Sequence, residues 1–188
     1  MGLFYSATDK ELLELRNKVF LAKGIQALIR NNFEKSLFRL TTFGRNNLND
    51  FQYEFCRIDK NKFLLFVNID ICRGDKYVQI YLNIFELHPN PLSLDNLLGL
   101  NGLEFRMYPN SNSRMRLRVD DSRGIPVLNL DLFKQHKIRT YFTKTGLIRE
   151  LERLGNLLED DLLSIDSFIK RWHEMHNPTM TDWEGNII

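Results

Sequence analysis

Four arginines fall on one face of a predicted β-hairpin. We expect strands over residues 103–108 and 114–120, paired so that Tyr108 lies opposite Arg114 across a turn rich in Asn and Ser. The outward face of this hairpin carries Arg106, Arg114, Arg116 and Arg118, with Arg123 beyond. Because guanidinium groups bind phosphate and carboxylate groups bidentately, the hairpin is a candidate binding site for RNA, DNA or an acidic protein surface.

The surroundings of these arginines favour a plainer interpretation. Charged outer faces also keep an edge hairpin from aggregating. Residues 103–124 hold five arginines against three carboxylates, a net charge of only +2, and Tyr108 is the one aromatic residue that stands among the arginines. Protection of the hairpin edge therefore explains the arginines more simply than nucleic-acid binding does.

Two histidines near the end of the chain have a spacing that resembles a metal motif. The zinc-protease motif places its histidines at i and i+4 around a glutamate, whereas His173 and His176 are three residues apart. No third ligand is marked, and His176 continues an apolar helical stripe after Trp172. We therefore predict no metal site and no cofactor, and expect His176 to pack against the helix or to cap its end.

An acid–base pair is the third candidate for chemistry. Asp70 and Tyr81 belong to the mixed face of a predicted central hairpin, together with Asn68, Gln79 and Asn83. If other elements cover that face, Asp70 becomes a buried carboxylate with a raised pKa, which is how a general acid or base is made. If the face meets water, the pattern reflects strand alternation alone. An enzyme centred on Asp70 and Tyr81, or on the two histidines, is the weakest of our hypotheses.

Motifs of well-known enzymes are missing from the sequence. It has no glycine-rich phosphate loop, no Gly-x-Ser-x-Gly elbow and no Cys-x-x-Cys pair. Arg73-Gly74-Asp75 spells an adhesion tripeptide, which we interpret as a turn. The formal net charge is +2 with 27% charged residues, unlike a polybasic nucleic-acid binder. Residues 144–188 carry a net charge of −4, which leaves +6 for the rest. The acidic end could complement the basic part of the same chain, could face a basic partner, or could be a solvated helix face.

Cysteine placement and hydropathy predict the compartment. Cys56 and Cys72 fall about 26 Å apart along the predicted strands, too far for a disulfide, and free thiols fit a reducing compartment. No signal peptide and no membrane-spanning run is apparent, so we expect a cytoplasmic location. The start matches the N-myristoylation pattern at Gly2, a short pattern that is common by chance, so lipidation is left open.

The candidate residues depend on two predicted hairpins. Strands on either side of the turn Arg73–Lys76, with Cys72 opposite Tyr77, give one aliphatic face, because this register pairs Ile69 with Ile80, Val67 with Leu82 and Leu65 with Ile84. A strand over residues 50–58 precedes them. Closing its three-residue loop with Ile58 opposite Lys62 adds an aromatic row to the same face. The predicted pairs of this row are Phe55 with Leu65, Tyr53 with Val67 and Phe51 with Ile69.

Helices are expected at both ends of the chain. A capping box at Thr8 and Glu11 begins a helix over residues 8–34, with Gly24 marking a kink or a close contact. A strand over 37–43 and a short helix over 93–98 follow, and residues 125–143 are either strand or helix. Near the C-terminus we expect two helices that meet at Gly155, then a tail over 177–188.

Together these elements predict an α+β fold in one domain, residues 1–188. A single antiparallel sheet of five to seven strands, a meander of hairpins, has the N-terminal helix on one face and the C-terminal helices beside it. The leading functional hypothesis is a non-enzymatic, cytoplasmic protein-binding module of a chaperone-, adaptor- or immunity-like kind. The alternative is a nucleic-acid binder that uses Arg106, Arg114, Arg116 and Arg118. The partner is expected to be another protein, and self-association is left open.

Overall fold

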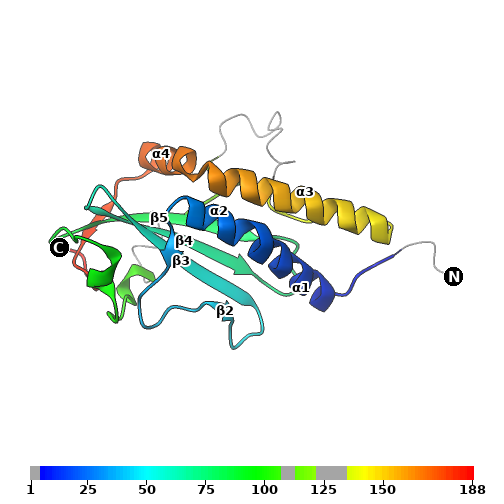
Figure 1. The fold of residues 1–188 in the computed structure, drawn as a ribbon, viewed down its shortest axis with the longest axis horizontal. Helices are drawn as coiled ribbons and strands as arrows, with labels where there is room; N and C mark the ends of the chain where they lie inside the picture. Colours follow the sequence, from blue (N-terminus) through cyan, green and yellow to red (C-terminus); the bar gives the residue numbers. More distant parts are fainter. Residues whose placement is uncertain (1–4, 107–112, 122–134) are drawn as a thin grey trace.

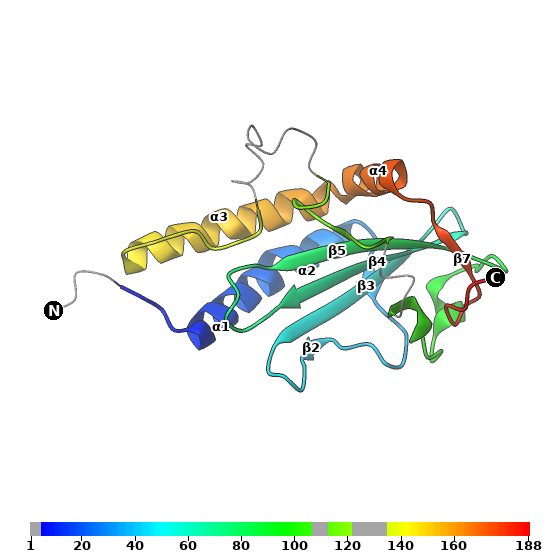
Figure 2. The ribbon, with the colours of Figure 1, turned by 180° about the vertical axis from the view of Figure 1, so that it is seen from behind.

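A computed structural model describes residues 5–106, 113–121 and 135–188. One seven-stranded sheet carries its α-helices on a single face, as Figures 1 and 2 show from opposite sides. This layer contains α1 (Asp9–Val19), α2 (Ile25–Arg30), α3 (Lys144–Leu163) and α4 (Ile165–Met175). The predicted α+β class, with one sheet and helices from both ends of the chain, is confirmed.

The sheet is built around three long strands. These are β3 (Phe51–Asp59), β4 (Phe63–Ile71) and β5 (Gln79–Leu87), joined as an antiparallel meander. Short strands complete the edges: β1 (Glu34–Lys35) and β2 (Gly44–Arg45) pair with β3, while β6 (Met115–Arg116) and β7 (Thr179–Thr181) pair with β5. The β5–β7 pair is parallel and the other pairs are antiparallel.

The register of the central hairpin is as predicted. Ile69 pairs with Ile80, and Asp70 pairs with Gln79. Val67, Ile69, Ile80 and Leu82 are all fully buried against the helices, so the aliphatic face is the core face. A slip by one residue would have moved Asp70 into this layer.

The register between β3 and β4 differs from the prediction by two residues. Tyr53 pairs with Ile69 and Phe55 with Val67, because the ladder continues to the pair Asp59–Phe63. The loop is then Lys60–Lys62, in which Lys60 and Asn61 are left-handed, both with φ of 51°. A two-residue shift leaves every side chain on its own face, which is why the aromatic row still joins the core.

The N-terminal helix begins as predicted and then changes to a wider, π-helical turn. The Thr8–Glu11 capping box is present, and a π-helical turn over Phe20–Gly24 separates α1 from α2. A Cβ atom on Gly24 would lie 2.4 Å from the Phe20 ring, so the glycine allows that ring to pack into the core. The helix ends at Arg30 rather than at residue 34.

Three further predictions are wrong. No strand spans residues 37–43, because Phe38 turns inward to a second apolar cluster. The C-terminal helix does not break at Gly155: α3 passes through it at a close approach to Val19, and the break comes at Ser164. Residues 177–188 are more than a tail, because β7 extends the sheet. The short helix after Ser93 is present as a 3-10 turn, Leu94–Leu97 (η2).

The second predicted hairpin is also wrong. Residues 104–106 form a 3-10 turn (η3, Glu104–Arg106), residues 107–112 lie outside the described part, and only Met115 and Arg116 form a strand, which pairs with β5. The physical reason is Phe105, which packs against Phe38, Phe66 and Phe85 and draws its segment across the sheet. Of the undecided stretch 125–143, residues 135–143 are described and make one bridge, Tyr77 with Lys137.

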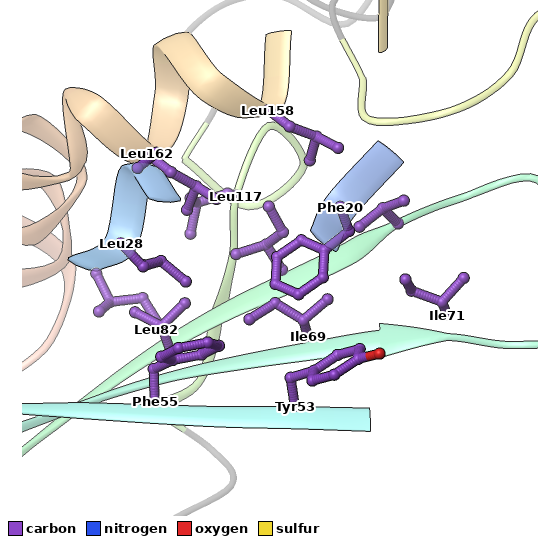
Figure 3. Packing of buried hydrophobic residues seen from close by; sticks show 14 of the residues in the cluster. Phe20, Leu28, Tyr53, Phe55, Ile69, Ile71, Leu82, Leu117, Leu158 and Leu162 are labelled. Carbon is purple, nitrogen blue, oxygen red and sulfur yellow. The ribbon is translucent and has the colours of Figure 1, made fainter. Parts of the chain in front are cut away.

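Two apolar clusters occupy opposite faces of the sheet. The large one lies between the sheet and the helices, where Leu158 and Leu162 of α3 face Ile69 and Leu82 (Figure 3). The small one covers one end of the other face. Its buried members are Phe38, Cys56, Leu64, Phe66, Phe85, Leu87, Leu97 and Phe105. The remainder of that second face is polar and carries the candidate site.

Candidate functional site

The candidate site is a cavity on the helix-free face of the sheet, beside the small apolar cluster. Its volume is about 190 Å³. Phe66, Phe85 and Phe105 form an apolar side, and polar side chains complete the lining. The polar and charged lining residues are Thr42, Gln52, Glu54, Asn68, Asp70, Asn83, Arg106 and Arg114. We call this helix-free surface, from β3 to β6, the polar face.

Glu54 is the buried carboxylate of the cavity, with a side chain that is 6% exposed. Arg106 binds it bidentately, with Nη2–Oε1 at 2.9 Å and Nε–Oε2 at 3.1 Å. Thr41 Oγ1 and Asn68 Nδ2 donate to the same carboxylate at 2.9 and 3.1 Å. Since Arg106 also donates to the Leu40 carbonyl, this pair fixes η3 and the segment before β2 onto the sheet. Four hydrogen bonds occupy Glu54, so it is poorly suited to act as a base.

Asp70 and Tyr81 do not form the acid–base pair that the sequence suggested. Asp70 accepts hydrogen bonds from Gln52 and Arg114, at 3.2 and 3.3 Å. The Tyr81 hydroxyl donates to Gln79 Oε1 at 2.5 Å, and burial raises the pKa of Tyr81. Each group is therefore bound to a different neighbour.

The four predicted arginines separate into three environments. Arg106 and Arg114 line the cavity. Arg116 lies next to it, with its guanidinium carbon 4.8 Å from the centre of the Tyr77 ring. Arg118 adopts a left-handed backbone, φ 63°, and turns to the helical side of the sheet. Arg123 lies outside the described part of the chain.

Arg118 belongs to a second buried carboxylate site, centred on Asp161 of α3. Its Nε and Nη2 atoms lie 2.8 and 2.5 Å from the two Asp161 oxygens, and His136 Nε2 lies 2.8 Å from Oδ2. Burial alone would raise the pKa of Asp161, but the bonds from Arg118 and His136 outweigh it and lower that pKa. The sequence holds one signal of this site: Asp161 stands on the apolar stripe of α3, between Leu158 and Leu162.

The two histidines of α4 and its cap point to aromatic neighbours. His173 packs on Phe63 with 5.7 Å between ring centres, and His176 packs on Trp172 at 5.2 Å, as expected for His176. Burial lowers the pKa of both histidines. Within residues 5–106, 113–121 and 135–188, no group of three or more His, Cys, Asp or Glu side chains is arranged to hold a metal ion.

Both cysteines are free thiols. Cys56 belongs to the small apolar cluster, and its burial raises the pKa of the thiol to about 12. Burial also raises the pKa of Cys72. Because the thiolate is the nucleophile, neither side chain is prepared for covalent chemistry.

Comparison of the chain with protein-family models, with curated proteins and with solved structures gave no match. Among the described helices, none is both long and apolar enough to span a bilayer. The candidate site therefore has to be interpreted from its own chemistry. It offers apolar rings, amides and carboxylates that are paired with arginines.

Proposed function

We propose that the chain is a non-enzymatic protein-binding module that receives a segment of its partner on the polar face. The observation that carries the proposal is the pairing of charges in the cavity. Glu54 is bound by Arg106, and Asp70 by Arg114 and Gln52. An acid–base catalyst needs a titratable group directed at a substrate, and in this cavity the carboxylates are directed at arginines and amides.

The composition of the polar face supports a protein partner. Aromatic residues and arginine are enriched at protein interfaces, and here Tyr81 and Phe105 accompany two arginines. Leu40, whose carbonyl accepts from Arg106, is 45% exposed, so apolar surface adjoins the charged pair. The proposal includes a cytoplasmic location, with which the two free thiols agree.

A photo-crosslinking experiment tests the proposal. Thr42 lines the cavity, and none of the described hydrogen bonds involves its side chain, so a photoreactive phenylalanine should be tolerated there. In the native cell we expect irradiation to give a discrete protein adduct from this position. The same group at Lys10, an exposed position on α1, should give none.

The adduct is identified by mass spectrometry and then reproduced with the purified partner. Failure of Thr42 to give an adduct above the Lys10 control would contradict the proposal. An adduct that nuclease digestion removes would also contradict it, and would favour a nucleic-acid partner instead.

Nucleic-acid binding through Arg106, Arg114, Arg116 and Arg118 is the second candidate function. One observation favours it: in the described part of the chain, no carboxylate pairs with the Arg116 guanidinium. Against it, Arg106 and Arg118 are each bound bidentately by a buried carboxylate. These two arginines cannot reach a phosphate without giving up their bidentate pair with that carboxylate.

A further inference from the structure

A row of three cations follows the side of β5 that faces away from β4. Lys137 pairs with Tyr77 and Arg116 pairs with Tyr81, so their side chains share the polar face with these two tyrosines. Arg114 precedes Arg116 by two residues and therefore lies on the same face. We call Lys137, Arg116 and Arg114 the cation row.

Each cation of the row rests on a tyrosine ring. The guanidinium carbons of Arg114 and Arg116 lie 3.8 and 4.8 Å from the centres of Tyr81 and Tyr77, and Lys137 Nζ lies 5.6 Å from the Tyr77 centre. A cation held over an aromatic ring is attracted to one side of it and keeps its other N–H groups for a further partner. The rings thus fix the positions of the charges before any ligand binds.

The row carries positive charge that its surroundings leave largely unpaired. Among the described residues, Asp70 is the one carboxylate that pairs with the row, through Arg114 at 3.3 Å. The remaining side-chain N–H groups of Arg114, and the side-chain N–H groups of Arg116 and Lys137, are therefore available to a ligand. Each of them would make a charge-assisted hydrogen bond to a carboxylate.

We infer that the partner contributes an extended acidic segment that lies along the cation row. This inference rests on the proposed protein-binding function and names the chemistry of the partner. In an extended chain, alternate side chains lie about 7 Å apart on one side, the same interval that separates Arg114 from Arg116 on their own strand. Alternating acidic residues therefore match the charge of the row and the spacing of its two arginines.

The same geometry disfavours a nucleic-acid strand as the ligand. Single strands gain much of their affinity by stacking bases on open aromatic rings. In the cation row, Arg114 and Arg116 already cover faces of Tyr81 and Tyr77. The cations offer edges to carboxylates, while the rings offer little free surface to bases.

Fluorescence anisotropy with a labelled peptide of alternating glutamate and threonine tests the inference on the full chain. At about 0.05 M ionic strength, where surface charges are weakly screened, we expect saturable binding that weakens with added salt. The variant R114Q/R116Q/K137Q should bind about tenfold more weakly or worse, because it removes three charge pairs. The matched control K10Q/K18Q/R30Q removes equal charge from exposed positions of α1 and α2, and should stay within about twofold of the wild type.

Several results would overturn the inference. They are absence of peptide binding, equal losses in the two triple variants, or tighter and row-dependent binding of a single-stranded oligonucleotide. If circular dichroism shows that the first triple variant is unfolded, Arg116→Gln alone replaces it, with an expected loss of about threefold. An adduct at Thr42 that forms equally well in the triple variant would refute the acidic segment and leave the protein-binding function intact.

Discussion

Each face of the sheet contains a buried carboxylate that is bound by an arginine, and the two carboxylates have different surroundings. On the helical face, Asp161 and its partner His136 are only 4% and 2% exposed, so this pair is sealed from water, while the second partner, Arg118, is 25% exposed. On the polar face, Glu54 is 6% exposed, yet its partner Arg106 is 31% exposed and borders the cavity. Each carboxylate binds an arginine from an irregular segment and so holds that segment in place. They differ because water can reach Arg106 when Glu54 is lost, whereas it cannot reach the buried His136 when Asp161 is lost.

The largest loss in the free energy of unfolding is expected at Asp161, the sealed site. Replacing Asp161 by Ala leaves Arg118 and His136 without their acceptor, and removal of one member of a buried ion pair costs about 3–5 kcal/mol. The neighbouring Asp160→Asn, at an exposed position, should cost less than about 0.5 kcal/mol. Urea unfolding of both variants measures the difference. Similar losses of unfolding free energy in the two variants would mean that water reaches Asp161 and that its pair with His136 is not sealed.

The second-largest loss in the free energy of unfolding is expected on the aliphatic side of the sheet. Ile69→Ala removes a fully buried side chain from the centre of the main core, at a cost of about 2–5 kcal/mol. Gln79→Ala changes the opposite face, where the side chain bonds Asp75 and Tyr81 at half-exposed positions that water can hydrate, and should cost well under 1 kcal/mol. Equal losses in urea unfolding would show that the two faces are not distinct.

Glu54→Ala should have a smaller effect than Asp161→Ala. The variant loses a bidentate pair, but the partly exposed Arg106 can be hydrated and keeps its bond to Leu40, so we expect about 1–3 kcal/mol. Glu34→Ala, on the exposed edge strand β1, serves as the control and should be near neutral. A loss at Glu54 as large as that at Asp161 would contradict the proposed role of solvent.

The sequence predicted the strands whose two faces differ clearly in hydropathy. Alternation in β4 and β5 determined their register, because any one-residue error buries Asp70. The same argument could not detect a two-residue error between β3 and β4, since parity is then conserved. Only the length of the ladder beyond Ile58 distinguishes the two registers.

The candidate site was harder to predict because its members come together through tertiary contacts. Arg106 and Arg118 look equivalent in an alternating pattern, yet Phe105 draws one segment across the polar face and the left-handed Arg118 turns to Asp161. The arginines were recognised as candidates, but their carboxylate partners were not. Glu54 precedes Arg106 by 52 residues, and Asp161 follows Arg118 by 43, so no local spacing links them.

The smallest change in the free energy of unfolding is expected from titration of Asp161 at the sealed site. Because the pKa of Asp161 is lower in the folded state than in the unfolded state, its ionised form stabilises the fold above the unfolded pKa of about 3.9. That contribution is lost as the pH falls through the lower, folded value. Burial raises the pKa of the neighbouring Asp121, so its protonation acts in the opposite sense and stabilises the fold as the pH falls.

The two carboxylates can be separated by working in an Asp121→Asn background. Unfolding free energies of this variant, with and without Asp161→Asn, should differ most near neutral pH, begin to converge below about pH 4 and meet only below the lowered folded pKa of Asp161. The convergence follows because the wild-type carboxylate becomes protonated there and resembles the amide. A difference that stays constant from neutral to acidic pH would show that the charge of Asp161 contributes nothing to stability, and the comparison with Glu54 would then rest on packing alone.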